Sequence, residues 1–212
     1  MTVIEFLSSA HRLSKELRAD IFQVLHVVST HQGRELRDSG EFVLEHPCDV
    51  MRQLMDLHFP PDVIVAGGLH DVIEDTEVTY EMIAQEFNAI IAEMVQAVSK
   101  RPKADFPDKQ ARLTEFHARF VFEAGQNFYI IFIKLADRLH NLETLHGLER
   151  KDLTKVERIA RETLAFYVPL AVHLAKDLVP PKLHPILDKY AEKMRMLAEN
   201  SLINIHAHHA PA

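Results

Sequence analysis

Apolar residues recur at three- and four-residue spacings along almost the whole chain of 212 residues. This spacing is typical of helices that bury one face, because 3.6 residues complete a helical turn. The first stripe, over residues 3–29, contains Val3, Leu7, Ala10, Leu13, Leu17, Ile21, Val24, Leu25 and Val28. Glycine, at six residues, is too scarce for many tight turns or flexible linkers. The periodicity therefore predicts an all-α fold of roughly 8–11 helices.

Several residues indicate where the expected helices begin or where two helices pack closely. Pro47 can open a helix, because a first turn does not use the N–H that proline lacks. A helix that starts near Pro61 and continues through GLHDVIEDT is apolar nearly all round, so we expect it at the centre of the fold. Gly67 and Gly68 within it indicate a close helix contact. The run FYIIFI, residues 128–133, could be a strand, but the length of the pattern around it favours a helix.

We expect a single domain over residues 1–205, with a C-terminal helix over 182–203 and a disordered tail over 206–212. The chain is long enough to bury a sizeable core without disulfides or structural metals. Its single cysteine, Cys48, excludes an internal disulfide framework. The apolar residues of the C-terminal helix could cap the core or form the interface of a homo-oligomer, and the sequence does not choose between the two.

Composition and charge argue against several classes of protein. Hydrophobic residues make up 47% of the chain and charged residues 26%, which is typical of a globular protein rather than a disordered one. No apolar stretch approaches the roughly 20 residues that span a bilayer, and no N-terminal segment resembles a cleavable signal, so we expect a cytoplasmic protein with no membrane partner. A net charge of −7 without a basic stripe argues against DNA or RNA as a partner.

The run GLHDVIEDT, residues 68–76, places one imidazole and three carboxylates inside an apolar segment. On a helix, His70 shares a face with Glu74, and Asp71 shares a face with Asp75, so all four could line one wall of a cavity. A solvated acidic turn at a helix C-terminus is the alternative, but such a turn would oppose the helix dipole. Buried carboxylates need a metal, cations or water, and the run therefore indicates a functional site.

A second polar cluster follows the apolar run. Its members fall at positions i, i+3, i+7 and i+10, on one helical face: Lys134, Asp137, Asn141 and Thr144. A polar stripe on an otherwise apolar helix indicates a ligand. Arg138 and His140 lie off this stripe, and we expect a surface ion pair for the first and a packed or solvated ring for the second.

A metal site can be assembled from three separate segments of the chain. Two imidazole nitrogens and two carboxylate oxygens are offered by His46, His70, Asp71 and Asp137. This mixed set suits Mn²⁺, Fe²⁺, Co²⁺ or Zn²⁺, and four protein ligands leave coordination positions open for water and substrate. Glu74 and Asp75 can then deprotonate or orient the attacking water for reaction at phosphorus.

At this level of detail the sequence resembles the hydrolase domain of the RelA/SpoT homologues. The similarity rests on four motifs in the same order: SGEFVLEHP (39–47), the HD pair (70–71) followed by the ED pair (74–75), KLADRLHNLETL (134–145) and KVERIARETLAFYVPLAVHLA (155–175). It covers most of residues 20–178. Because 212 residues leave no space for the synthetase and regulatory regions of the long family members, the chain looks like a stand-alone small alarmone hydrolase.

The resemblance implies an all-helical HD fold and Mn²⁺-dependent removal of pyrophosphate from the 3′ position of (p)ppGpp, giving GDP or GTP. The family's metal ligands match His46, His70, Asp71 and Asp137. Its water-activating pair matches Glu74 and Asp75. The basic residue that packs on the base matches Arg37, and residues that contact the nucleotide match Asn141 and Thr144.

The stretch before the HP pair departs from the family pattern. Family members usually have RKSGEPYI before the HP pair, whereas this chain has RDSGEFVL, with Asp38 for lysine, Phe42 for proline and Val43 for tyrosine. A lost cation and a new anion are expected to weaken binding of a polyphosphate, unless the carboxylate accepts hydrogen bonds from the base. We therefore expect an intact phosphate-handling centre with altered nucleotide choice, and ppApp or the 2′-phosphate of NADPH become competing substrates.

Cations must also meet the substrate phosphates, because the net charge of the chain is negative. We expect Lys134 and Arg37 in this role. Other cations near the expected pocket or in nearby loops are Arg34, Lys100, Arg101 and Lys103. For the run SKRPK, residues 99–103, an exposed basic turn is at least as good an interpretation as a phosphate clamp.

Two other functions compete with hydrolysis of an alarmone. A non-catalytic nucleotide sensor would keep the pocket, but it has no physical need for Glu74 and Asp75. A general HD nucleotidase or phosphodiesterase is the nearest enzymatic alternative, and the full KLADRLHN context argues against it. We expect Cys48 to be a small packed residue rather than a nucleophile, because attack by water needs no thiol.

Overall fold

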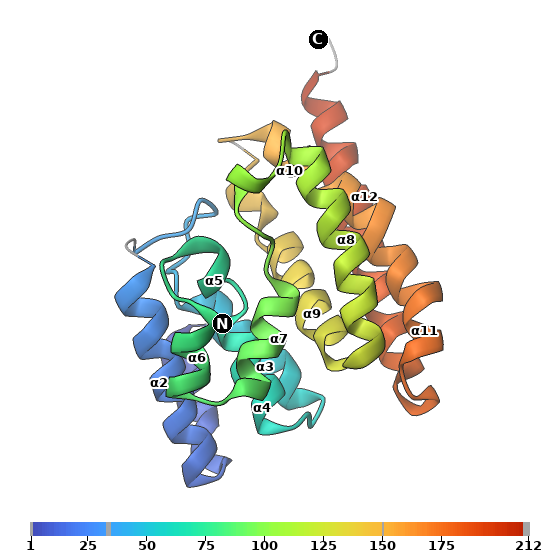
Figure 1. Cartoon of the computed structure of the whole chain (residues 1–212). Coiled ribbons are helices and arrows are strands. Elements are labelled where there is room, and N and C mark those ends of the chain that lie inside the picture. The colour runs from blue at the N-terminus through green and yellow to red at the C-terminus, as the bar shows by residue number, and fades with distance from the viewer. Residues whose placement is uncertain (1, 33–34, 150, 210–212) are drawn as a thin grey trace. The chain divides into compact units, whose positions relative to one another are not determined.

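The computed structural model of the chain describes residues 2–32, 35–149 and 151–209, with side chains as far as Ile205. The regular elements of these ranges are helices (Figure 1), so the predicted all-α fold is confirmed. The backbone groups into two compact units: unit 1 comprises Met1–Glu35 and Phe42–Lys134, and unit 2 comprises Leu36–Glu41 and Leu135–Ala212. The single domain over 1–205 stays a prediction.

Among the described residues, no helix combines the length and the apolar character needed to cross a membrane.

Unit 1 contains the helices of the first two thirds of the chain. They are α1 (Val3–Ser9), η1 (Ala10–Arg12), α2 (Lys15–His31), α3 (Glu45–Asp56), α4 (Pro61–Leu69), α5 (Val72–Asp75), α6 (Tyr80–Glu86), α7 (Ala89–Val98), η2 (Lys103–Asp105), α8 (Lys109–Gln126) and the first part of α9 (Tyr129–Glu143). Several begin at a side chain that accepts a backbone N–H, as Ser14 does for α2 and Asn88 for α7. Thr79 caps α6 in the same way, because its hydroxyl accepts from the N–H of Met82.

Helix α4 lies at the centre of unit 1, as its apolar sequence predicted. Every residue from Val63 to Leu69 is buried, and the helix packs against α2, α3 and α7. A Cβ at Gly67 would lie 2.3 Å from Leu54 Cδ1, and a Cβ at Gly68 would lie 2.6 Å from Val24 Cγ1. These distances are far shorter than a van der Waals contact, so the two glycines do mark a close helix contact.

We expect the Gly68→Ala variant to be less stable by about 1–3 kcal/mol, because its new methyl group overpacks the contact of α4 with α2 and α3. Chemical denaturation would measure the free energy of unfolding. The matched control is Gly125→Ala near the end of α8, where a Cβ would meet nothing within 4 Å. This control is expected to gain up to about 1 kcal/mol from helix propensity. Equal or greater stability of the Gly68 variant would contradict the close packing.

The helix expected from Pro61 through the acidic run is interrupted, so that part of the prediction is wrong. Helix α4 ends at Leu69, and α5 begins only at Val72. The His70 ring contributes a physical reason, because its Nδ1 lies 2.7 Å from the carbonyl oxygen of Gly67. In a continuous helix that oxygen would accept from the N–H of Asp71. His70 and Asp71 consequently occupy a turn between two helices.

Helix α9 includes residues 129–133 of the run that could have been a strand. Residues 130–133 are helical and almost fully buried, so the interpretation by pattern length is confirmed. The boundary between the two units falls within this helix, after Lys134.

Unit 2 contains the remaining helices. After the second part of α9 come η3 (Leu145–Gly147), α10 (Leu153–Glu162), the π-helical turns η4 (Thr163–Tyr167) and η5 (Leu170–Leu174), α11 (Ala175–Leu178), η6 (Pro181–Leu183) and α12 (His184–His209). Helix α12 packs on α10, η4 and η5 through a buried stripe that includes Leu187, Tyr190 and Met194. Its apolar face therefore covers the core of unit 2, whereas an oligomer interface stays a prediction.

The C-terminal helix extends beyond its expected end at residue 203. The backbone of α12 continues to His209, and residues 210–212 lie outside the described part of the chain.

Candidate metal centre

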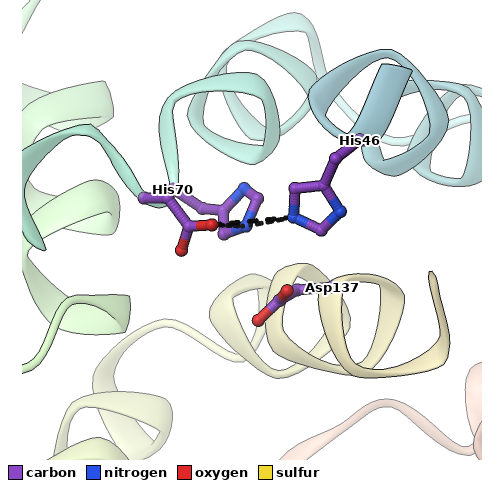
Figure 2. Close-up of side chains that lie close together, drawn as sticks. His46, His70 and Asp137 are labelled. Carbon is purple, nitrogen blue, oxygen red and sulfur yellow. Dashed lines mark hydrogen bonds and ion pairs between the residues drawn. The ribbon is translucent and has the colours of Figure 1, made fainter. Parts of the chain in front are cut away.

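Two histidines of unit 1 direct their rings at each other (Figure 2). His46 lies in the first turn of α3, which begins at Glu45, two residues earlier than Pro47 predicted. His70 lies in the turn after α4. Their Nε2 atoms are 3.0 Å apart, and both residues are only 2% exposed. Burial of two imidazoles with facing nitrogens is unfavourable unless a proton or a cation lies between them.

Asp71 adds a carboxylate to this pair. Its Oδ2 lies 3.2 Å from His70 Nε2 and 3.6 Å from His46 Nε2. The ligand atoms of these three residues all lie within 4.8 Å of one another. Two ligands at right angles on an ion with bonds of about 2.1 Å would be about 3.0 Å apart, so the observed spacing suits a divalent metal.

The orientation of the His70 ring supports the same interpretation. Because Nδ1 donates to the carbonyl of Gly67 at 2.7 Å, the lone pair of the neutral ring is on Nε2 and faces the cluster. Metal-binding histidines generally donate their second nitrogen in this way, which fixes the tautomer. The His/Asp cluster of unit 1 is therefore suited to a divalent metal ion.

Unit 2 brings together three of the predicted site residues. Asp137, which projects from α9 (Figure 2), accepts a hydrogen bond from Asn141 Nδ2 at 2.6 Å. The Oδ1 of Asn141 accepts from Arg37 Nη2 at 2.8 Å, and Arg37 Nε pairs with Glu41 Oε1 at 3.1 Å. Arg37 is thus held beside Asn141 within unit 2.

Asp38, the main departure from the family pattern, is paired within unit 2. Its Oδ2 lies 2.5 Å from Lys155 Nζ, and its carbonyl oxygen accepts from Lys151 Nζ at 3.2 Å. These residues and Arg37 help to line a cavity of about 340 Å³. The new anion is therefore present, and a lysine of α10 pairs with it.

Glu74, a predicted water activator, is held by cations of unit 1. Its Oε2 accepts from the backbone N–H of Lys100 at 3.2 Å and lies 3.3 Å from Lys100 Nζ, while its Oε1 lies 3.4 Å from Arg112 Nη2. Lys100 was among the predicted cations, but Arg112 was missed. Nothing local distinguishes Arg112 from other polar residues of the amphipathic helix α8. Asp75, the other member of the pair, is exposed.

The remaining predicted residues are placed as follows. Lys134 is buried, with Nζ 5.9 Å from the centroid of the Phe116 ring. Thr144 follows α9 and donates its hydroxyl to the carbonyl of His140 at 3.0 Å. Arg101 and Lys103 line a cavity of unit 1 together with Lys100. Arg34 lies outside the described residues.

Arg138 does form the expected ion pair, but the prediction of a surface position is wrong. Its Nη2 lies 3.1 Å from Glu162 Oε1, and both side chains are buried. Its guanidinium also stacks on the Tyr167 ring, 4.2 Å from the centroid. The pair belongs to the core of unit 2. His140, the other residue off the stripe, is packed rather than solvated.

The thiol of Cys48 is fully buried in α3. Burial raises its pKa to about 12, with smaller contributions from nearby carboxylates. The thiol is therefore protonated at neutral pH and unsuited to nucleophilic attack, as the sequence predicted.

Comparison with known proteins adds a family and several relatives. Residues 25–175 match the model of a family described as the HD domain. A guanosine-3′,5′-bis(diphosphate) 3′-pyrophosphohydrolase of Haemophilus influenzae is 39% identical over 156 residues, which are 74% of this chain and 22% of that protein. The bifunctional (p)ppGpp synthase/hydrolase SpoT of Escherichia coli strain K12 is 43% identical over 144 residues, 68% of this chain and 20% of that protein. The chain thus spans about a fifth of the length of these curated relatives.

Solved structures share the fold. A structure reported for a metazoan ortholog of SpoT that hydrolyses ppGpp aligns with a TM-score of 0.58 and 20% identity, covering 82% of this chain and 95% of that one. A protein of Listeria monocytogenes EGD-e aligns with a TM-score of 0.52 and 23% identity, covering 73% and 99%. At such identities the likeness establishes the fold alone.

Proposed function

This chain belongs to the HD domain family, and we propose that it hydrolyses the 3′-pyrophosphate of a guanosine alarmone, (p)ppGpp, to GDP or GTP and pyrophosphate. The observation that carries the proposal is the convergence of His46 Nε2, His70 Nε2 and Asp71 Oδ2 in unit 1. A His/Asp cluster with one histidine fixed by a backbone carbonyl is suited to metal-assisted chemistry at phosphorus. The names of the curated relatives supply the substrate class.

Asp137 is the proposed fourth ligand, and Mn²⁺ the proposed ion. Its carboxylate is buried on α9 and oriented by a hydrogen bond from Asn141, and carboxylates that bind metals are generally oriented by such bonds. Two nitrogen and two oxygen ligands suit Mn²⁺ among the transition metals. A bound ion would supply Lewis-acid activation of the water and of the phosphoryl group.

Glu74 and Asp75 are the proposed water-activating residues. Both lie on the short helix α5, directly after the turn that carries His70 and Asp71. The oxygen of the water attacks the phosphorus that is bound to the 3′-oxygen. The bond between this phosphorus and the 3′-oxygen breaks, and one carboxylate receives a proton from the water. The 3′-oxygen leaves as a hydroxyl once it is protonated, so ppGpp and water give GDP and pyrophosphate.

Arg37, Asn141, Thr144 and Lys134 are the proposed contacts of the nucleotide. Arg37 and Asn141 support this role because they are hydrogen-bonded to each other, and Arg37 lines the 340 Å³ cavity together with Asp38. A carboxylate in such a cavity can accept hydrogen bonds from an amino group of a purine ring. Because adenine and guanine both have such an amino group, adenosine substrates, ppApp or the 2′-phosphate of NADPH, stay as the second candidate.

We expect ppGpp to be hydrolysed fastest when ppGpp, ppApp and NADPH are compared side by side with Mn²⁺. Phosphate or pyrophosphate release, measured as kcat/KM for each substrate, gives the comparison. Faster turnover of ppApp or NADPH would transfer the assignment to the adenosine substrates. Equally slow turnover of ppGpp, ppApp and NADPH would refute all three substrate assignments.

A further inference from the structure

Unit 1 contains a cavity of about 770 Å³ beside α5, and its lining is suited to phosphate. Five cationic side chains and three carboxylates line it, although the chain as a whole carries a net charge of −7. A local excess of positive charge in an acidic protein is suited to a small anion. The cationic wall comes from the loop after α7 and from α8.

Glu74 contacts two side chains of this cationic wall. It contacts Lys100 through both the backbone N–H and Nζ, at 3.2 and 3.3 Å, and Arg112 Nη2 at 3.4 Å. Charge-assisted hydrogen bonds are usually about 2.7–2.9 Å long, so these donors are held loosely by the carboxylate. All three side chains are at least three-quarters buried, with exposed fractions of 18% for Glu74, 23% for Lys100 and 12% for Arg112.

The two cations are oriented by contacts that do not involve Glu74. The Nε of Arg112 donates to the carbonyl of Arg101 at 2.6 Å, which leaves Nη2 directed at the carboxylate. Lys100 Nζ lies 5.1 Å from the centroid of the Phe116 ring. These fixed directions would persist if another anion replaced Glu74.

The cavity is connected to the histidine cluster through the backbone. The hydroxyl of Ser99 contacts the carbonyl oxygen of His70 at 3.4 Å and donates to that of Val95 at 2.7 Å. Lys100 is the next residue, so its N–H and side chain are anchored close to the turn that carries the proposed metal ligands.

We propose that Lys100 and Arg112 bind the diphosphate group that leaves the nucleotide, and that Glu74 contacts their donors while this subsite is empty. The inference rests on the proposed function and specifies which residues receive the leaving group. A diphosphate offers more acceptor oxygens than a carboxylate, and Arg112 can donate to phosphate with its planar fork.

The proposal is tested with inorganic pyrophosphate as the probe, in titration calorimetry without metal so that metal-bridged binding does not contribute. We expect Lys100→Gln and Arg112→Gln each to weaken binding by roughly tenfold to a hundredfold, since each removes one charged hydrogen-bond donor. Glu74→Gln is expected to tighten binding, because it removes the competing internal anion. This opposite sign separates the proposal from a general loss of folding.

Matched controls remove the same charges elsewhere in unit 1. Lys15→Gln and Arg12→Gln change exposed residues and are expected to alter binding by less than about twofold. GDP serves as the second probe, because its 5′-diphosphate carries the same chemistry. We expect GDP binding to be unaffected by the Lys100 and Arg112 changes.

Several outcomes would overturn the proposal: no binding of pyrophosphate by the unmodified chain, unchanged binding by the Lys100 and Arg112 variants, or weaker binding by Glu74→Gln. Loss of GDP binding with intact pyrophosphate binding would also overturn it, since the cavity would then serve the 5′-diphosphate. None of these measurements needs turnover. Failure of the proposed hydrolysis and failure of this inference are therefore distinguishable.

Discussion

The His70→Ala variant is expected to lose hydrolysis by more than about 10³-fold, because the ion contributes several kcal/mol of transition-state stabilisation. His70 is the best residue for this test. Its Nε2 lies 3.0 Å from His46 Nε2 and 3.2 Å from Asp71 Oδ2, and its Nδ1 is fixed by Gly67. Removal of the imidazole leaves only His46 and Asp71 of the three clustered ligands in unit 1.

Mn²⁺ binding provides a readout that is independent of activity. The unmodified chain is expected to unfold at a higher temperature when Mn²⁺ is added, because an ion that binds only the folded state stabilises it. The His70→Ala variant should show no such rise. The control is His26→Ala on the exposed face of α2, which should keep both the rise and the turnover. A His70 variant that still binds Mn²⁺ with unchanged affinity would rule out the metal centre.

The double variant Glu74→Gln with Asp75→Asn is expected to retain Mn²⁺ binding and to lose turnover by several powers of ten. A single general base contributes typically about 10²–10⁴-fold, and amides of the same shape can neither accept the proton nor carry the charge. Steady-state hydrolysis of ppGpp and the Mn²⁺-dependent rise in unfolding temperature would be measured on the same preparation.

This double variant also separates a hydrolase from a non-catalytic sensor. A sensor needs the nucleotide pocket but not a water activator, so its nucleotide binding and its response should survive the two amides. A hydrolase should lose only the chemical step. Glu81→Gln, on the exposed side of α6, is the matched control for an isolated change of charge. Normal turnover by the double variant would exclude both residues from the chemistry.

The helical class and the central position of α4 could be predicted because both depend on local patterns. Periodic apolar residues show which face of a helix is buried, and an apolar helix without a polar face must lie inside. The paired Gly67 and Gly68 likewise indicated a close contact, which α2 and α3 provide. The interruption at His70 was missed, because it depends on a ring nitrogen that contacts the carbonyl of Gly67.

By itself the sequence determined the helical class, the order of the motifs and the residue types available for a metal, since these depend on neighbours within a turn or two. Tertiary structure alone decided which charges meet. Arg112 reaches Glu74 across 38 residues, and Lys155 reaches Asp38 across 117. The physical reason is that the local sequence around a surface cation is similar in every amphipathic helix. Only the packing of distant segments decides which carboxylate the cation pairs with.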